Sequence, residues 1–121
     1  MNNYFFDSYA ILEIVKGNLN YDRFKEFTFI TTLLNLSEVY YSLLKEMNEV
    51  NAKNTINALN MEFIELNLDI VLEASSFRYK HIGNKFSFID CIGYVSALKN
   101  NLKFLTGDNG FEKVSNVEFV K

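Results

Sequence analysis

Hydrophobic and polar positions change period along this chain, and the changes predict strands that alternate with helices. Three consecutive aromatic residues, Tyr4 to Phe6, make a short strand that is apolar on both faces. Such a strand is typical of the centre of a parallel sheet that helices cover on both sides. The strand ends at Asp7, and the apolar run 10–16 predicts a helix that stops at Gly17. The chain therefore opens with a strand, an acid and a helix.

The later segments continue this alternation. We expect a short connecting helix within 18–27 and a second strand within 28–33. Apolar residues at helical spacing predict a buried stripe on the next helix, made of Leu36, Val39, Tyr40, Leu43, Leu44 and Met47. The remaining expectations are a polar helix over 49–60, a strand over 62–66, a helix over 68–80, a helix from Ser87 with Phe88 and Cys91 inward, and strands over 102–106 and 117–120.

Strands separated by helices imply right-handed parallel crossovers. The sequence therefore predicts an α/β fold: one three-layer α/β/α domain over residues 1–121, with a central, mainly parallel sheet of about five strands. The chain is 49% apolar and contains 12 Phe and 7 Tyr, which is enough to fill one core. Its length leaves no room for a second core.

Composition narrows the classes of function. There is no apolar run of roughly 18–20 residues and no signal-peptide pattern, and Cys91 is the only cysteine. We therefore expect a cytoplasmic protein without a membrane span or a disulfide framework. A net charge of -3 argues against broad duplex binding through a basic face. It leaves open a nucleic-acid enzyme whose bound divalent ions reverse the local charge.

Four carboxylates stand where the expected elements meet: Asp7, Glu38, Asp90 and Asp108. The carboxyl ends of parallel strands share one edge of the sheet with the first turns of the following helices. We therefore expect at least Asp7, Glu38 and Asp108 to converge. Clustered carboxylates repel one another, and a hard cation such as Mg²⁺ or Mn²⁺ relieves that repulsion while promoting phosphodiester hydrolysis.

Each acid also has a purely structural interpretation, which the sequence leaves open. Asp7 fits an N-cap, residues 35–38 and 87–90 each fit a capping box, and residues 107–110 fit a turn. The local patterns alone do not choose between these interpretations and a shared ion site.

Four motifs resemble those of one known family: Phe6-Asp7-Ser8-Tyr9-Ala10, Asn35-Leu36-Ser37-Glu38-Val39, Phe88-Ile89-Asp90-Cys91 and Leu105-Thr106-Gly107-Asp108-Asn109-Gly110-Phe111. In order and separation they are similar to the PIN (PilT N-terminus) domain family and its small VapC-type toxin ribonucleases. The resemblance spans essentially the whole chain. It departs from the family at Gly110, where many relatives carry a further acid.

The resemblance implies a Mg²⁺- or Mn²⁺-dependent endoribonuclease that hydrolyses RNA phosphodiester bonds. It implies that Asp7, Glu38, Asp90 and Asp108 hold the metal and that Ser8 and Thr106 are supporting hydroxyls. It further implies the toxin of a type II toxin–antitoxin pair, with a small antitoxin as partner. A homodimer is also expected, with surplus aromatic residues exposed at its interface: Tyr21, Phe24, Phe27, Tyr40 and Tyr41.

Several residues near these motifs are candidates for RNA binding. Arg78, Lys80 and Lys85 surround the loop before Asp90 and are suited to guiding a phosphate backbone, although a solvated helix end is an equally good interpretation. Tyr9 is suited to stacking on an unpaired base or to packing in the core. His81 beside the loop fits a helix cap or a surface position better than a proton shuttle.

Two other functions are compatible with an α/β chain of this length. One is a receiver-like phospho-acceptor signalling domain, which the residues disfavour because Ser8 replaces a second acid after the first strand and the chain lacks proline. The other is a catalytically inactive PIN-like scaffold that binds RNA or protein. Only an activity assay separates that scaffold from an enzyme.

Overall fold

The computed structural model describes residues 3–121, so the first two positions of the expected domain lie outside it. Within these residues, five strands form one sheet in the order β3-β2-β1-β4-β5, and all neighbouring pairs are parallel. The strands are β1 (Tyr4–Phe6), β2 (Phe29–Thr31), β3 (Met61–Phe63), β4 (Lys103–Thr106) and β5 (Val117–Phe119). The expected parallel sheet of about five strands is confirmed.

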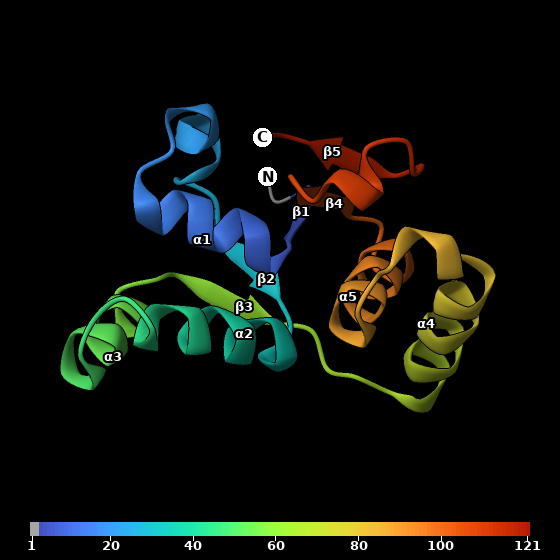
Figure 1. Cartoon of the computed structure of the whole chain (residues 1–121), viewed down its shortest axis with the longest axis horizontal. Coiled ribbons are helices and arrows are strands. Elements are labelled where there is room, and N and C mark those ends of the chain that lie inside the picture. The colour runs from blue at the N-terminus through green and yellow to red at the C-terminus, as the bar shows by residue number, and fades with distance from the viewer. Residues whose placement is uncertain (1–2) are drawn as a thin grey trace.

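Helices cover both faces of this sheet (Figure 1). They are α1 (Ser8–Lys16), α2 (Leu33–Leu44), α3 (Glu49–Asn57), α4 (Leu68–Lys80) and α5 (Phe88–Lys99), with short 3-10 turns η1 (Leu19–Phe24), η2 (Ile82–Asn84) and η3 (Asn109–Phe111). Helices α1 and α2 lie on one side, and α4 and α5 pack together on the other. No helix in the described residues is both long enough and apolar enough to span a bilayer.

The alternation of side chains along each strand explains the three layers. Phe5 packs into a core with α4 and α5, whereas Phe6 packs into a second core with α1, η1 and α2. On β4, Phe104 and Leu105 divide between the two cores in the same way. The apolar strands predicted from sequence are therefore buried on both faces, as a central parallel strand requires.

The order of strands decides which elements surround the tip of β1. Strands β2 and β4 flank β1, so the carboxyl ends of three neighbouring strands meet beside Asp7. Receiver domains have the order 2-1-3-4-5. The observed order 3-2-1-4-5 therefore excludes the receiver-like alternative.

Two of the aromatic residues expected at a dimer surface are instead in the core. Tyr21 and Phe24 are fully buried because η1 folds against α1, and the hydroxyl of Tyr21 donates a 2.6 Å hydrogen bond to the main-chain oxygen of Val120. Tyr41 is 64% exposed, as expected. The prediction for Tyr21 and Phe24 was wrong because η1 is too short to show a repeating pattern of apolar residues. Without such a pattern, the sequence does not reveal which of its side chains are buried.

Helix α5 also differs in detail from the expectation. Cys91 is fully buried, as predicted, but Phe88 is 55% exposed. Phe88 is the first residue of the helix and lies on its outer side, where the guanidinium of Arg78 stacks over the ring at 4.2 Å. The prediction that Phe88 faces inward was wrong, because an apolar pattern does not reveal a cation–π partner from another helix.

Candidate active site

Asp7 lies at the carboxyl end of β1 and is only 2% exposed. It occupies the N-cap position of α1, yet its side chain makes no capping hydrogen bond. Instead, Thr106 Oγ1 donates to Asp7 Oδ2 at 2.7 Å, and Asn35 Nδ2 approaches Asp7 Oδ1 at 3.4 Å. The capping interpretation of Asp7 is therefore wrong, and its carboxylate points toward the end of the sheet.

The surroundings of Asp7 make its negative charge unfavourable. Burial raises the pKa of Asp7 to about 8, and the nearby charges of Asp90 and Glu38 contribute in the same direction. The hydrogen bond from Thr106 opposes this rise in pKa without cancelling it. Without a bound cation, Asp7 is thus mostly protonated at neutral pH, and a bound cation would favour the ionised form.

Glu38 reaches the same region from the second turn of α2. Ser8 Oγ, in the first turn of α1, donates to Glu38 Oε1 at 2.6 Å. Burial raises the pKa of Glu38, while this hydrogen bond lowers it and the charge of Asp90 raises it further. Ser8 thus contacts one of the four carboxylates, and its role as a supporting hydroxyl stays a prediction.

Asn35 is a site residue whose role the sequence analysis missed. It is fully buried, and its Nδ2 donates to Ser8 Oγ at 3.0 Å as well as approaching Asp7. Its own Oδ1 accepts a 2.7 Å hydrogen bond from Thr32 Oγ1, and Thr32 is the N-cap of α2. The capping box predicted over 35–38 is therefore wrong, since the helix begins three residues earlier. The Thr32-x-x-Asn35 spacing is the feature of the sequence that could have identified this N-cap and the contact of Asn35 with it.

Asp90 and Asp108 each combine a structural role with a place in the site. Asp90 completes the capping box of α5, where its Oδ2 accepts from Ser87 N at 2.9 Å. Asp108 Oδ1 accepts from Gly110 N at 3.0 Å in the turn after β4. Burial raises the pKa of Asp90, and the charge of Asp108 adds to that effect. Both local interpretations were right, and they leave the second oxygen of each carboxylate available.

These four carboxylates line one open cleft of about 430 Å³ at the carboxyl edge of the sheet, together with Ser8 and Tyr9. In the hydrogen bonds of the described residues, Glu38, Asp90 and Asp108 each have one side-chain oxygen without a protein donor. Such oxygens are the ligands that hard divalent cations prefer.

The carboxylate oxygens that line the cleft are of the chemical type that binds a divalent ion. No three His, Cys, Asp or Glu side chains of residues 3–121 are already arranged to hold an ion. The carboxylate side chains would therefore have to change conformation before their free oxygens could bind one shared ion. The raised pKa of Asp7 and of its neighbours identifies the unfavourable charge that a shared cation would relieve.

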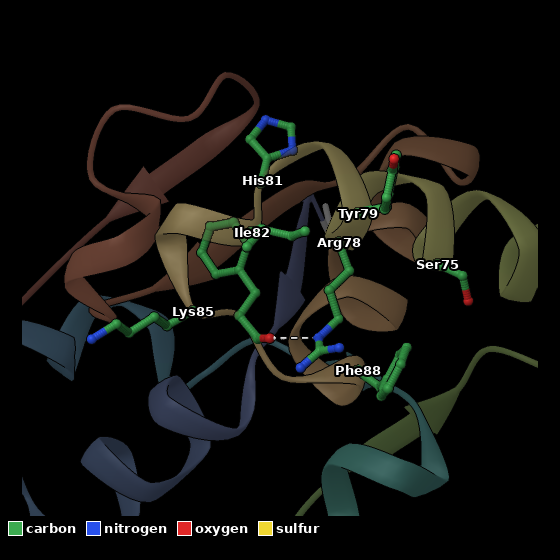
Figure 2. A pocket seen from close by; sticks show the side chains of 8 residues that line it. Ser75, Arg78, Tyr79, His81, Ile82, Lys85 and Phe88 are labelled. Carbon is green, nitrogen blue, oxygen red and sulfur yellow. Dashed lines mark hydrogen bonds between the residues drawn. The ribbon is translucent and has the colours of Figure 1, made fainter.

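The basic residues proposed for RNA lie outside this cleft. Arg78 and Lys85 line a separate hollow between the end of α4 and the start of α5, beside Phe88 and His81 (Figure 2). Arg78 Nε donates to the main-chain oxygen of Phe86 at 2.8 Å, so this side chain also holds the loop before α5. Lys80 is exposed and lines neither cavity.

His81 caps the end of α4, as expected. Its Nδ1 lies 2.8 Å from the main-chain oxygen of Phe77, and the two rings stack with centroids 4.1 Å apart. The ring is therefore occupied by contacts within its own helix. It does not line the carboxylate cleft.

Gly110, the position at which the sequence departs from the resemblance, is packed closely. A Cβ at this position would lie 2.8 Å from the ring of Phe86 and 3.4 Å from the main-chain oxygen of Asn84. Phe86 itself is buried and stacks on Phe111. An acid at position 110 would require the Phe86 ring to move. The observed packing of Phe86 therefore depends on glycine at this position.

Comparison with known proteins gives one family and several solved structures of similar fold. A family model described as "PIN domain" matches residues 4–117. No curated protein matches the chain. Solved structures that resemble it include a toxin–antitoxin complex from Klebsiella pneumoniae, at TM-score 0.75 and 18% identity over 95% of both chains.

Two further structures are similar at lower identity. VapBC2 from Rickettsia felis, bound to a DNA fragment from its promoter, has TM-score 0.75 and 16% identity over 98% of both chains. VapC20 from Mycobacterium tuberculosis, described as a sarcin–ricin loop cleaving toxin, has TM-score 0.80 and 15% identity over 98% of this chain and 99% of that one. These similarities support the same three-layer fold.

Proposed function

Because this chain belongs to the PIN domain family, we propose that it is a Mg²⁺- or Mn²⁺-dependent endoribonuclease that hydrolyses RNA phosphodiester bonds at the carboxylate cleft. The observation that carries the proposal is Asp7, a buried acid at the tip of the central strand with three further carboxylates around it. A buried carboxylate is unfavourable when ionised unless a cation compensates it. A divalent ion bound by oxygen ligands is the simplest compensation.

In this proposal Asp7, Glu38, Asp90 and Asp108 hold the metal. When bound, the ion would supply an activated water and a positive charge opposite the phosphate oxygens. The protein's own part is to hold the ligands at fixed positions. Of the contacts that do so, the hydrogen bonds of Ser8 to Glu38 and of Thr106 to Asp7 are the shortest, at 2.6 and 2.7 Å.

The wider biological role that we propose is that of a type II toxin acting on RNA in the cytoplasm. The similar structure from Klebsiella pneumoniae is a toxin–antitoxin complex and the one from Rickettsia felis is VapBC2, and both support a small antitoxin as partner. A homodimer is proposed with Tyr41 as the exposed member of the original aromatic set, and Phe27 and Tyr40 as partly buried members. Tyr9, Arg78, Lys80 and Lys85 are proposed to contact the RNA.

The test is cleavage of single-stranded RNA with Mn²⁺ or Mg²⁺, with EDTA, and with the variants Asp7→Asn and Asp90→Asn. Removing one ligand removes both metal affinity and charge stabilisation, so the rate should fall by several orders of magnitude. Asp22→Asn is the matched control, since Asp22 is exposed on η1. Equal cleavage by wild type and Asp7→Asn would show that the activity arises elsewhere.

The alternative is a PIN-like scaffold that binds RNA or protein without cleaving it. Gly110, which replaces an acid found in many relatives, is the observation that favours it. The same assay separates the two functions, because a scaffold would retain RNA binding while no metal ion produced cleavage above that of Asp7→Asn.

A further inference from the structure

Among the residues that the structure describes, Lys121 is the one basic residue that lines the carboxylate cleft. RNA carries one negative charge at each phosphate, so a cleft lined by four acids repels it except where a cation intervenes. A metal ion would compensate the phosphate at the reaction centre. The phosphates next to it still need a positive group, and Lys121 is the group within reach of the cleft.

We propose that Lys121 binds a phosphate of the RNA backbone beside the reacting one, and that Tyr9 is the positioning residue for its ammonium group. The proposal rests on the endoribonuclease function above. It adds the residue that holds the substrate against the repulsion of the acidic cleft.

The main chain that carries Lys121 is tied down on two sides. The main-chain oxygen of Lys121 accepts hydrogen bonds from Asn18 Nδ2 at 3.2 Å and Asn20 Nδ2 at 3.3 Å. One residue earlier, Val120 N donates to Thr106 O at 2.9 Å, and Val120 O accepts from the hydroxyl of Tyr21 at 2.6 Å. Because β4 and η1 both hold this segment, the Lys121 side chain starts from a fixed point at the rim of the cleft.

Asn18 is itself held by several contacts. Its Oδ1 accepts from Asn20 N at 2.9 Å, and its Nδ2 also donates to Glu13 Oε1 at 2.8 Å. The asparagine therefore links α1, η1 and the segment that carries Lys121. Asn18 and Asn20 therefore both donate to the main-chain oxygen of Lys121. These two hydrogen bonds fix the position of the lysine main chain.

The ring of Tyr9 holds the other end of the lysine. Lys121 Nζ lies 5.6 Å from the centroid of the Tyr9 ring, within the range of a cation–π interaction. Tyr9 can approach because position 107 is a glycine. A Cβ there would overlap both the Tyr9 ring and the main-chain oxygen of Val120. Gly107 thus lets the ring and the segment before Lys121 come together over the cleft.

The ammonium group of Lys121 forms no ion pair with an acid among residues 3–121. A lysine retained only to neutralise the acids would be expected to contact one of them directly. The exposed Lys121 instead lies over an aromatic ring with its donors available to a ligand. Phosphate oxygens are the ligands for which a lysine ammonium is suited.

The experiment is fluorescence anisotropy of a short labelled single-stranded RNA of mixed sequence, with Ca²⁺ in place of Mg²⁺ and a gel to confirm intact RNA. Lys121→Met should weaken binding roughly three- to tenfold and reduce the slope of log K against log salt by about 0.7, the loss of one phosphate contact. Lys121→Arg should restore both. Lys103→Met is the matched control, since Lys103 is exposed at the start of β4, the opposite edge of the sheet.

Tyr9 has its own pair of variants in the same assay. Tyr9→Phe keeps the ring and should bind RNA as wild type does. Tyr9→Leu removes the cation–π contact and should reproduce part of the reduction in salt slope seen for Lys121→Met, which the loss of base stacking by Tyr9 alone would not cause. Thermal melts of each variant with EDTA check that the fold is retained.

Three results would overturn the proposal. If wild type binds and cleaves RNA while Lys121→Met keeps the same affinity and salt slope, the lysine contacts no phosphate and only this inference falls. If Lys121→Met instead changes the stabilisation by Mg²⁺ and leaves RNA binding intact, the lysine is a counter-ion of the acids. If wild type itself neither binds nor cleaves RNA, the endoribonuclease proposal falls and the role of Lys121 falls with it.

Discussion

Asp7→Asn should make the metal-free protein more stable at neutral pH, although Asp7 is a proposed ligand of the active site. Asparagine has nearly the shape of protonated aspartate and can still accept the hydrogen bond from Thr106 through its amide oxygen. It does not titrate, so folding at neutral pH no longer requires the uptake of a proton, as it does for the wild-type carboxyl. The weak 3.4 Å contact from Asn35 is lost in exchange.

The size of the effect follows from the pKa of Asp7. This pKa is raised from 3.8 to about 8 in the folded protein. Between these values the unfolded chain has released its proton and the folded chain has not, so the free energy of unfolding falls as pH rises. The slope is about 1.36 kcal/mol per pH unit. From pH 5 to pH 7, the advantage of Asp7→Asn over wild type should therefore grow by roughly 2–3 kcal/mol.

Urea unfolding in EDTA at several pH values measures this gap directly. Asp22→Asn is the control, because Asp22 is exposed and its ion pair with Lys25 is a surface pair worth little. Adding millimolar Mg²⁺ should stabilise wild type alone, by roughly 1–3 kcal/mol for a ligand at several-fold to 100-fold over its Kd. A gap that is constant with pH would refute the reasoning, since it would mean that folding does not hold Asp7 in its protonated form.

Three further predictions follow from particular contacts. Ser8→Ala removes the 2.6 Å hydrogen bond to Glu38 and should weaken Mg²⁺ affinity about 10- to 100-fold with little change in fold, which calorimetric titration would detect; unchanged affinity would mean Ser8 does not orient a ligand. Gly107→Ala forces a Cβ against Tyr9 and should lower stability by about 1–3 kcal/mol in thermal melts, whereas Gly83→Ala, with open space around it, should change little. Light scattering at micromolar concentration should give twice the 14.1 kDa monomer mass, and a monomer would contradict the proposed homodimer.

The sequence determined the elements of this protein because their signals are local. Three aromatic residues in a row required a strand buried on both sides, and β1 is that strand. The Ser87-x-x-Asp90 spacing identified the start of α5 correctly. Acids at the junctions of elements were expected to meet at one edge of a parallel sheet, at least Asp7, Glu38 and Asp108, and these three line one cleft there together with Asp90.

Only the tertiary structure decided how those elements surround the site. Asn35 contacts both Asp7 and Ser8 because β1 and β2 are neighbours in the sheet. No local pattern in the sequence encodes that order of strands. Tyr21 is buried because η1 folds back on α1, a contact that a hydrophobic period cannot report. Lys121 reaches the cleft through hydrogen bonds to residues about a hundred positions earlier. Local sequence sets backbone preferences, whereas contacts between distant segments depend on how the whole chain buries its apolar surface.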